Sequence, residues 1–190
     1  MSLVPELRFP EFKDEWRDMR LGEIAYCLDN QRIPVKESDR AKRKGKYPYW
    51  GSTKVMDYID DYIFDGEFIL LSEDGGNFYD YLNKPIAFYV NGKFWANNHI
   101  HVLKIHEDNF TKFIFFVLEH KNILAYIIGG TRTKLNKKDM MKIKIKLPSL
   151  PEQQKIANFL SAIDDKIELE KKKLEQIKAY KKGLMQKMFI

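Results

Sequence analysis

The chain has 190 residues, of which 44% are apolar and 14% aromatic, and its formal net charge is +6 at pH 7. This composition is sufficient for one well-filled hydrophobic core and excludes an intrinsically disordered chain. The single cysteine, Cys27, excludes a disulfide framework or a zinc ribbon, and together with the lack of a signal peptide or a spanning apolar run it predicts a cytoplasmic protein without membrane contacts.

The first fifty residues predict loops and short elements. Residues 5–16 combine prolines with aromatic side chains, which is typical of an extended segment packed onto a core. Residues 20–28 predict a short helix or strand. Residues 32–46 carry seven basic and two acidic side chains, so they predict a loop with a basic surface. Residues 47–53 predict a compact turn that is dense in aromatic rings.

The middle of the chain holds the clearest strand signals. Residues 67–72 predict a buried strand that ends at a glycine-containing turn, residues 73–77. The Asn91-Gly92 pair is the favoured sequence for a two-residue hairpin turn. We therefore expect a hairpin between strands at residues 86–90 and 93–96.

A strand, a helix and a last strand complete the globular part. Residues 99–105 predict a strand, and residues 109–128 show helical spacing of apolar side chains up to a Gly-Gly pair. Residues 131–146 carry seven basic residues and one acidic residue. Within them, residues 142–147 alternate strictly, which predicts a strand with one solvated basic face.

Residues 148–190 predict one long helix after a mixed α/β domain of residues 1–147, so the fold class is α+β. Ser149 and Glu152 have the spacing of a capping box, and Pro151 falls in the first turn. Apolar residues then recur at alternating intervals of four and three, as in a coiled-coil seam. The seam positions are Ile156, Leu160, Ile163, Ile167, Glu170, Leu174, Ile177, Lys181, Leu184 and Met188, eight of them apolar. Such a helix is about 55 Å long, overhangs its domain and needs a partner.

Charges on this seam predict an antiparallel partner. In a parallel homodimer Glu170 and Lys181 would each face their own copy, whereas an antiparallel pair centred near Lys172 removes both clashes. The antiparallel layers are Ile156 with Met188, Leu160 with Leu184, Ile163 with Lys181, Ile167 with Ile177 and Glu170 with Leu174. A helix of another protein, or packing of the helix on its own chain, stays open as an alternative.

Few residues are arranged for catalysis. The chain has no P-loop, Rossmann, zinc-protease, methyltransferase or nuclease motif. His99 and His101 share a face of a predicted strand, but without a third ligand a base or phosphate contact, or a core position, is favoured over a metal site. Glu73 and Asp74 are interpreted as a solvated loop rather than an acid/base pair. We predict neither catalytic nor metal-binding residues.

Basic, aromatic and amide side chains suit nucleic acid better. The two basic segments could follow a phosphate backbone, although solvated faces are the alternative. Asparagine and histidine side chains could read base edges, although the rings could instead be core and the asparagines part of a turn. The candidate DNA-binding residues are Lys42, Arg43, Lys44, Lys46, Tyr49, Trp50, Asn77, Asn97, Asn98, His99, Thr131, Arg132 and Lys134.

Two stretches near the C-terminus carry a resemblance to a known family. Leu-Pro-Ser-Leu-Pro-Glu-Gln-Gln-Lys-Ile at residues 147–156 and Tyr-Lys-Lys-Gly-Leu-Met-Gln-Lys-Met-Phe at residues 180–189 closely resemble the conserved helical region of type I restriction–modification specificity (S) subunits. Residues 5–10, 21–24 and 47–53 resemble the target recognition domain of these subunits. The resemblance covers nearly the whole chain.

The resemblance implies a DNA-reading protein without chemistry of its own. An S subunit has two recognition domains, each followed by a conserved helix. The helices pack antiparallel, and each domain reads half of a bipartite site in double-stranded DNA. Methyltransferase (M) subunits that use S-adenosylmethionine bind the helices, and a restriction (R) subunit that uses ATP and Mg²⁺ joins them, so we expect no cofactor on this chain. One domain with one helix would be a half-subunit, natural or truncated, that forms a homodimer.

Other functions stay open on the residues alone. The chain could be a coiled-coil interaction protein, a stand-alone DNA-binding regulator, or an enzyme that acts by itself. Gel shifts on random duplex at two salt concentrations separate the first from a DNA-binding protein. Incubation with DNA and Mg²⁺, or with S-adenosylmethionine, tests the last.

Overall fold

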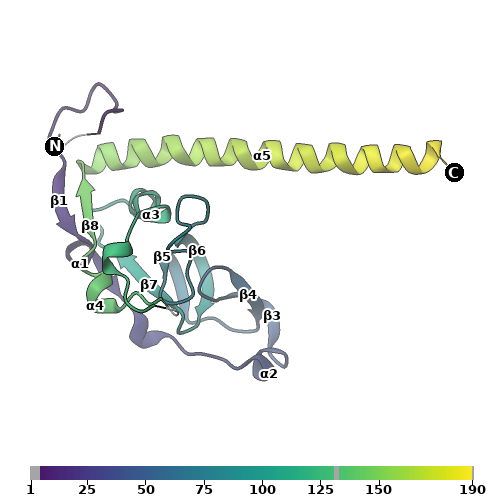
Figure 1. Ribbon diagram of the computed structural model, residues 1–190, viewed down its shortest axis with the longest axis horizontal. Coiled ribbons are helices and arrows are strands. Elements are labelled where there is room, and N and C mark those ends of the chain that lie inside the picture. The colour runs from purple at the N-terminus through teal and green to yellow at the C-terminus, as the bar shows by residue number, and fades with distance from the viewer. Residues whose placement is uncertain (1–4, 131–132, 190) are drawn as a thin grey trace.

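The computed structural model describes residues 5–130 and 133–189, which form a globular part with one long helix along its edge (Figure 1). The fold is α+β, as predicted. Helix α5, Leu150–Met188, starts on the globule and extends far past it. Within the described residues, no helix combines the length and the apolarity that a membrane span requires.

A six-stranded sheet with the order β2-β7-β5-β6-β3-β4 forms the centre of the globule. All neighbours are antiparallel except β3 and β6, which are parallel. The strands are β2 (Ala25–Cys27), β3 (Lys44–Trp50), β4 (Val55–Ile59), β5 (Phe64–Ser72), β6 (Ala87–Ala96) and β7 (Ile100–Ile105). A separate pair joins β1 (Arg17–Arg20) to β8 (Lys144–Leu147), and because β8 leads into α5, this pair fixes the start of the long helix.

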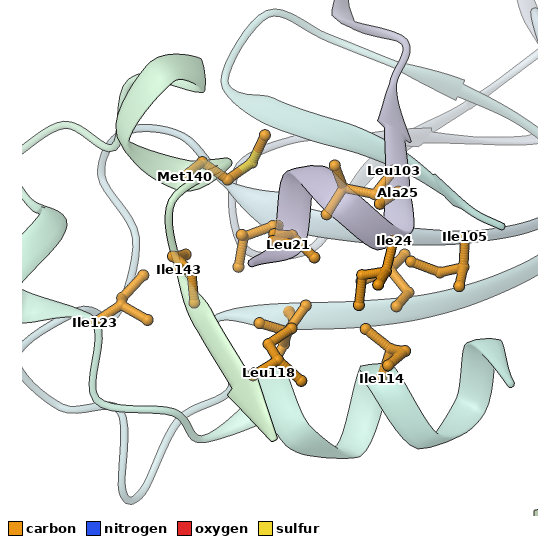
Figure 2. Close-up of a cluster of buried hydrophobic side chains, with 14 of the residues drawn as sticks. Leu21, Ile24, Ala25, Leu103, Ile105, Ile114, Leu118, Ile123, Met140 and Ile143 are labelled. Atoms are coloured by element: carbon orange, nitrogen blue, oxygen red, sulfur yellow. The ribbon is translucent and has the colours of Figure 1, made fainter. Parts of the chain in front are cut away.

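Short helices cover one face of the sheet and enclose the main core. Leu21 and Ile24 of α1 gather with Ile114 and Leu118 of α3, and all four are almost completely buried (Figure 2). Burial of a side chain of this size stabilises the fold by roughly 1.5–3 kcal/mol. The helices and 3₁₀ turns of the globule are α1 (Leu21–Ile24), α2 (Glu37–Arg40), α3 (Thr111–Glu119), α4 (Lys137–Met140), η1 (Asp29–Gln31) and η2 (Leu124–Tyr126).

The hairpin predicted at Asn91 and Gly92 is wrong. Strand β6 continues through both residues and stays paired with β5. Gly92 lies opposite Gly66, and their φ angles are +112° and +127°. Two facing glycines with positive φ allow a sharp bend in a continuous ladder, because they carry no Cβ. The sheet curls so far that Ser72 at the end of β5 donates to the carbonyl of Ser52, which follows β3, at 2.7 Å.

Gly92→Ala should lower the free energy of unfolding by about 1–3 kcal/mol, because an L side chain is strained at this φ even though the space around it is empty. Gly183 in α5 is equally uncrowded. The matched change Gly183→Ala should therefore stabilise its helix by roughly 0.5–1 kcal/mol. Urea unfolding followed by circular dichroism measures both, and a Gly92→Ala protein as stable as Gly183→Ala would contradict the strained bend.

Other predicted elements are confirmed in part. The strands predicted at residues 67–72, 99–105 and 142–147 correspond to β5, β7 and β8. The helix predicted over residues 109–128 ends at Glu119, and the side chain of Asn122 then accepts a hydrogen bond from the Leu124 amide and starts a separate turn. The aromatic segment at residues 47–53 is mostly strand β3, and the basic segment before it contains helix α2.

The capping box predicted for α5 does not form. Ser149 is the N-cap residue but makes no side-chain hydrogen bond to the helix. Glu152 is instead only 1% exposed and accepts two hydrogen bonds of 2.7 Å from Arg8 and one of 3.3 Å from the Trp16 indole. A bidentate charged pair outweighs a local cap, and it attaches the N-terminal segment to the start of α5.

The seam of α5 is uncovered along most of its length. Ile156 and Leu160 are half-buried against the globule, whereas the later apolar seam residues are exposed. Their exposed fractions are 42% for Ile163, 47% for Ile167, 51% for Leu174, 64% for Ile177, 40% for Leu184 and 71% for Met188. Among the described residues nothing covers this stripe, which makes it a candidate interaction surface.

Candidate nucleic-acid interface

Four loop segments from distant parts of the sequence meet beside the C-terminal end of β5. We call them the loop rim: residues 51–54, 73–77, 97–99 and 133–135. The backbone carbonyl of Glu73 accepts a hydrogen bond from the Leu135 amide at 2.7 Å. The backbone amide of Glu73 donates to the carbonyl of His99 at 3.0 Å. The Ser52 hydroxyl donates to the carbonyl of Asp74. Hydrogen bonds to backbone carbonyls therefore hold the four segments together as one surface.

Several polar side chains of the loop rim reach solvent. Asn98 is exposed, and the side chains of His99 and Lys134 are 39% and 46% exposed. Nδ1 of His99 lies 2.7 Å from a carboxylate oxygen of Asp74, and Nζ of Lys134 lies 3.1 Å from Glu73. Amide, imidazole and ammonium groups on one surface offer the donors and acceptors that base-edge recognition requires.

Two predicted contact residues have their amides committed to the fold of the rim. Asn97 is 5% exposed, and its side-chain oxygen accepts from the backbone amide of His99 at 2.8 Å. The side-chain amide of Asn77 donates to the carbonyl of Pro85 at 3.0 Å. Both residues shape the loops that carry the exposed groups, which is the turn role left open by the sequence.

A group of charges lies buried beneath the loop rim. Nη1 of Arg32 donates to a Glu73 carboxylate oxygen at 2.6 Å and to the carbonyl of Ile100 at 2.8 Å. His101 is 1% exposed, and its Nδ1 lies 2.6 Å from Asp29. Glu73 itself is 9% exposed, so the prediction that it belongs to a solvated loop is wrong. Its charge is compensated inside the protein, as a buried carboxylate requires.

Both ring nitrogens of His101 are engaged inside the protein. Nε2 lies 2.8 Å from the carbonyl of Leu135, which can only accept a hydrogen bond, so Nε2 is a donor. Nδ1 faces a carboxylate oxygen of Asp29 at 2.6 Å. Burial raises the pKa of Asp29, but the hydrogen bond and charge of His101 and the charge of Arg32 outweigh it and lower that pKa below its ordinary value. The contact between His101 and Asp29 ties β7 to the η1 turn beneath the loop rim.

Acidification should destabilise the protein through Asp29 and Glu73. Burial also raises the pKa of Glu73, but the Arg32 hydrogen bond and nearby positive charges hold it below its ordinary value. A carboxyl with a lowered folded-state pKa stabilises the protein above its unfolded pKa of about 4, and this contribution is lost as the pH falls further. The urea midpoint should drop steeply below pH 4 and less steeply in Asp29→Asn. Identical pH profiles of the two proteins would contradict this origin of acid sensitivity.

The histidines do not form the metal pair that the sequence left open. His99 and His101 contact different carboxylates, those of Asp74 and Asp29. Ligand atoms of Cys27, Asp29 and His101 do lie within 4.8 Å of one another. Both nitrogens of His101 are already engaged, however, and burial raises the pKa of the Cys27 thiol to about 12, which disfavours the thiolate that a metal requires.

The basic run before β3 lies apart from the loop rim. Lys44 begins β3 and Trp50 ends it, about 20 Å away at the usual rise of a strand. Lys44 pairs with Asp57 at 2.7 Å, and Arg43 pairs with Asp60 at 2.9 Å. Such exposed pairs are weak enough to exchange for a phosphate.

The remaining predicted contact residues differ widely in exposure. Lys42 and Lys46 are exposed, Tyr49 is a core residue at 1% exposure, and Trp50 is half-buried against Phe88. The two other predicted residues, Thr131 and Arg132, lie outside the described residues. The lysines therefore suit a phosphate contact, and the two rings serve packing.

Strand pairing adds one surface cluster that sequence reasoning missed. The rings of Tyr47 and Tyr62 lie 5.0 Å apart, and the ammonium groups of Lys46 and Lys93 lie over them at 5.4 and 4.4 Å. Cations beside half-buried rings form a surface suited to nucleic acid. Tyr62 lies in the connection before β5 and Lys93 lies in β6, so the two residues are far apart in sequence and no local motif could reveal the cluster.

Comparison with known proteins gives a consistent set of similarities. A family model described as type I restriction modification DNA specificity domain matches residues 13–179. A putative type I restriction enzyme specificity subunit of Haemophilus influenzae is 38% identical over 78% of this chain and 37% of its own length. A putative type I specificity subunit of Mycoplasma pneumoniae is 31% identical over 64% of this chain and 33% of its own length.

Solved structures show the same fold. The crystal structure of a type I restriction–modification S subunit from M. genitalium superposes with a TM-score of 0.76 over 100% of this chain and 49% of that chain, at 18% identity. This chain therefore spans about a third of the two sequence relatives and about half of the structural one.

Proposed function

Because the chain belongs to the family of type I restriction–modification DNA specificity domains, we propose that it is a sequence-recognition module that reads one half of a bipartite site in double-stranded DNA. The loop rim carries this proposal, since backbone hydrogen bonds bring Asn98, His99 and Lys134 from two distant loops onto one surface. Exposed lysines at residues 42 and 46 supply phosphate contacts, which position the protein without reading sequence.

The chain needs partners for any chemistry on DNA. In this proposal the long helix binds M subunits, and an R subunit joins the complex. S-adenosylmethionine, ATP and Mg²⁺ are used by those subunits, and no cofactor binds this chain. The exposed seam of α5 supports a rod on which other subunits assemble.

A homodimer through α5 would rebuild two recognition domains. The antiparallel register places apolar residues opposite apolar residues in most layers and brings Asp164 near Lys178 of the partner. A two-fold axis between the protomers requires that the two half-sites be inverted copies. The target is therefore an interrupted palindrome.

His99→Ala and Lys46→Ala should affect DNA binding in different ways. Loss of a base-reading imidazole should cost about 1–3 kcal/mol on the target sequence and leave binding to random duplex nearly unchanged. Loss of the Lys46 phosphate contact should weaken binding to target and random duplexes alike. It should also reduce the slope of log affinity against log salt concentration by about one unit. Fluorescence anisotropy on target and random duplexes at several salt concentrations measures both. If His99→Ala lost the same affinity for both duplexes, His99 would contact the DNA phosphate backbone rather than a base.

Methylation mapping tests the function as a whole. Cells that carry this chain with a methyltransferase partner should acquire methylated adenines within one interrupted palindrome. Cells that carry the methyltransferase alone are the control. Methylation that is independent of this chain, or a contiguous asymmetric site, would contradict the proposal.

A further inference from the structure

Two apolar surfaces at opposite ends of α5 have no cover among the described residues. One is a hollow of about 330 Å³ between the N-terminal segment and the start of α5. The hollow is lined by Leu7, Phe9, Trp16, Ile156, Phe159 and Leu160, of which Leu7 is 91% exposed and Phe159 is 54% exposed. The other surface is the end of α5, where Met185, Met188 and Phe189 are 50%, 71% and 80% exposed.

The antiparallel register brings these two surfaces together. Met188 of one protomer faces Ile156 of the other, and Leu184 faces Leu160. Both Ile156 and Leu160 line the hollow. One residue further on, Phe189 comes next to Lys155, whose ammonium group lies 4.7 Å above the ring of Phe9 in the hollow.

We propose that the N-terminal segment, residues 5–16, and the start of α5 form a socket that receives the end of α5 from a second copy of this chain. Met188 and Phe189 are the inserted side chains, and a flexible thioether fits an irregular aromatic site well. This inference rests on the proposed antiparallel dimer and adds the N-terminal segment to its interface. Two-fold symmetry makes two identical sockets per dimer.

The socket is held in shape within each protomer. Arg8 and Glu152 form a buried bidentate pair, and Phe9 packs edge-on against Phe159 with ring centres 5.9 Å apart. Lys155 closes one side through its contact with Glu11. A site ordered before binding loses little conformational entropy when it is filled, which favours a stable complex.

A second copy fits this socket better than an unrelated helix does. The described part of each chain carries one socket and one apolar helix end, so two copies in antiparallel orientation cover both surfaces of both chains. A helix from another protein would have to fill the socket, and that protein would also have to cover Met188 and Phe189 at the other end of α5. Reciprocal coverage is the property of an isologous interface.

Cross-linking between Leu7→Cys and Phe189→Cys in one chain tests the socket. The two positions lie at opposite ends of a 39-residue helix, about 55 Å apart, so a short bis-maleimide can join them only between protomers. The native Cys27 is a poor competitor because burial raises its pKa to about 12, and the unmodified chain measures its background. The matched pair Leu7→Cys with Glu175→Cys places the second thiol in the middle of the exposed helix.

The socket predicts that Leu7→Cys/Phe189→Cys becomes covalent dimer roughly 100-fold faster than the mid-helix pair, because neighbouring thiols in the socket have millimolar effective concentration. Sedimentation velocity on the same samples reports the dimer independently. A dimer in which the two pairs react equally slowly overturns the socket and leaves the dimer standing. A protein that is monomeric at tens of micromolar overturns both the socket and the antiparallel dimer. Efficient cross-linking of the single variant Phe189→Cys would show a parallel dimer, and that result also overturns both.

Discussion

Ile177→Glu should convert the homodimer into monomers at tens of micromolar protein. In the antiparallel register this carboxylate faces Ile167, and two-fold symmetry repeats the layer on the other side of the centre. Each layer loses the burial of an isoleucine and has to desolvate a charge, which together cost about 3 kcal/mol. Two layers amount to about 6 kcal/mol, or about four decades in Kd. Sedimentation equilibrium over a concentration series measures this change.

Leu169→Glu is the matched control for this experiment. Leu169 is 52% exposed on the same helix but lies off the seam, so the same substitution should leave the dimer intact. Thermal unfolding of the globular part should be similar in both variants, because Ile177 lies beyond the contacts of the globule. Dimerisation of Ile177→Glu with unchanged affinity would exclude the proposed register.

The long helix was the most predictable element because its pattern is local and repeated. Apolar residues at alternating intervals of four and three over five heptads can be recognised within the segment itself, without knowledge of the globular part. Strand β8 is predictable for the same reason, since strict alternation places Ile145 and Leu147 on one buried face. The cap at Ser149 was not predictable, because the competing partner of Glu152 is Arg8, which lies at the other end of the chain.

The hairpin prediction was wrong because the Asn-Gly pair occurs in two kinds of local structure. Asn91 and Gly92 tolerate unusual backbone angles, and a tight turn and a bent strand both require this. The decisive fact is the position of Gly66 directly opposite Gly92 in the ladder. Strand pairing across 26 positions is a tertiary property, and only the register of β5 on β6 reveals it.

The site was predictable in its segments but not in its chemistry. Sequence reasoning selected Asn97, Asn98 and His99 as one contact segment, yet the structure buries the first and exposes the second. Glu73 looked solvated because its partners are remote: Arg32 precedes it by 41 residues and Lys134 follows from another loop. Burial of a charge depends on such partners, and local composition does not contain them.

Arg32→Ala should lower the free energy of unfolding by about 3–5 kcal/mol, because it leaves buried carboxylates without their compensating charge. Arg32 holds Glu73 at 2.6 Å and the backbone carbonyl of Asp29 at 3.1 Å, and its side chain is 12% exposed. Arg32→Lys keeps the charge but loses the planar guanidinium that reaches several acceptors. Its free energy of unfolding should therefore lie between those of the unsubstituted protein and Arg32→Ala. Urea unfolding measures the series.

Arg43→Ala is the matched control, because Arg43 is also an arginine paired with a carboxylate, but its side chain is 31% exposed and that of its partner Asp60 is 51% exposed. An exposed pair contributes about 1 kcal/mol or less. Sequence-specific DNA binding should also fall in Arg32→Ala, since Glu73 connects this charge to the Leu135 and His99 backbone of the loop rim. Equal stabilities of Arg32→Ala and Arg43→Ala would mean that the buried charges do not support the rim, and His99 would then owe its position to the backbone ladder alone.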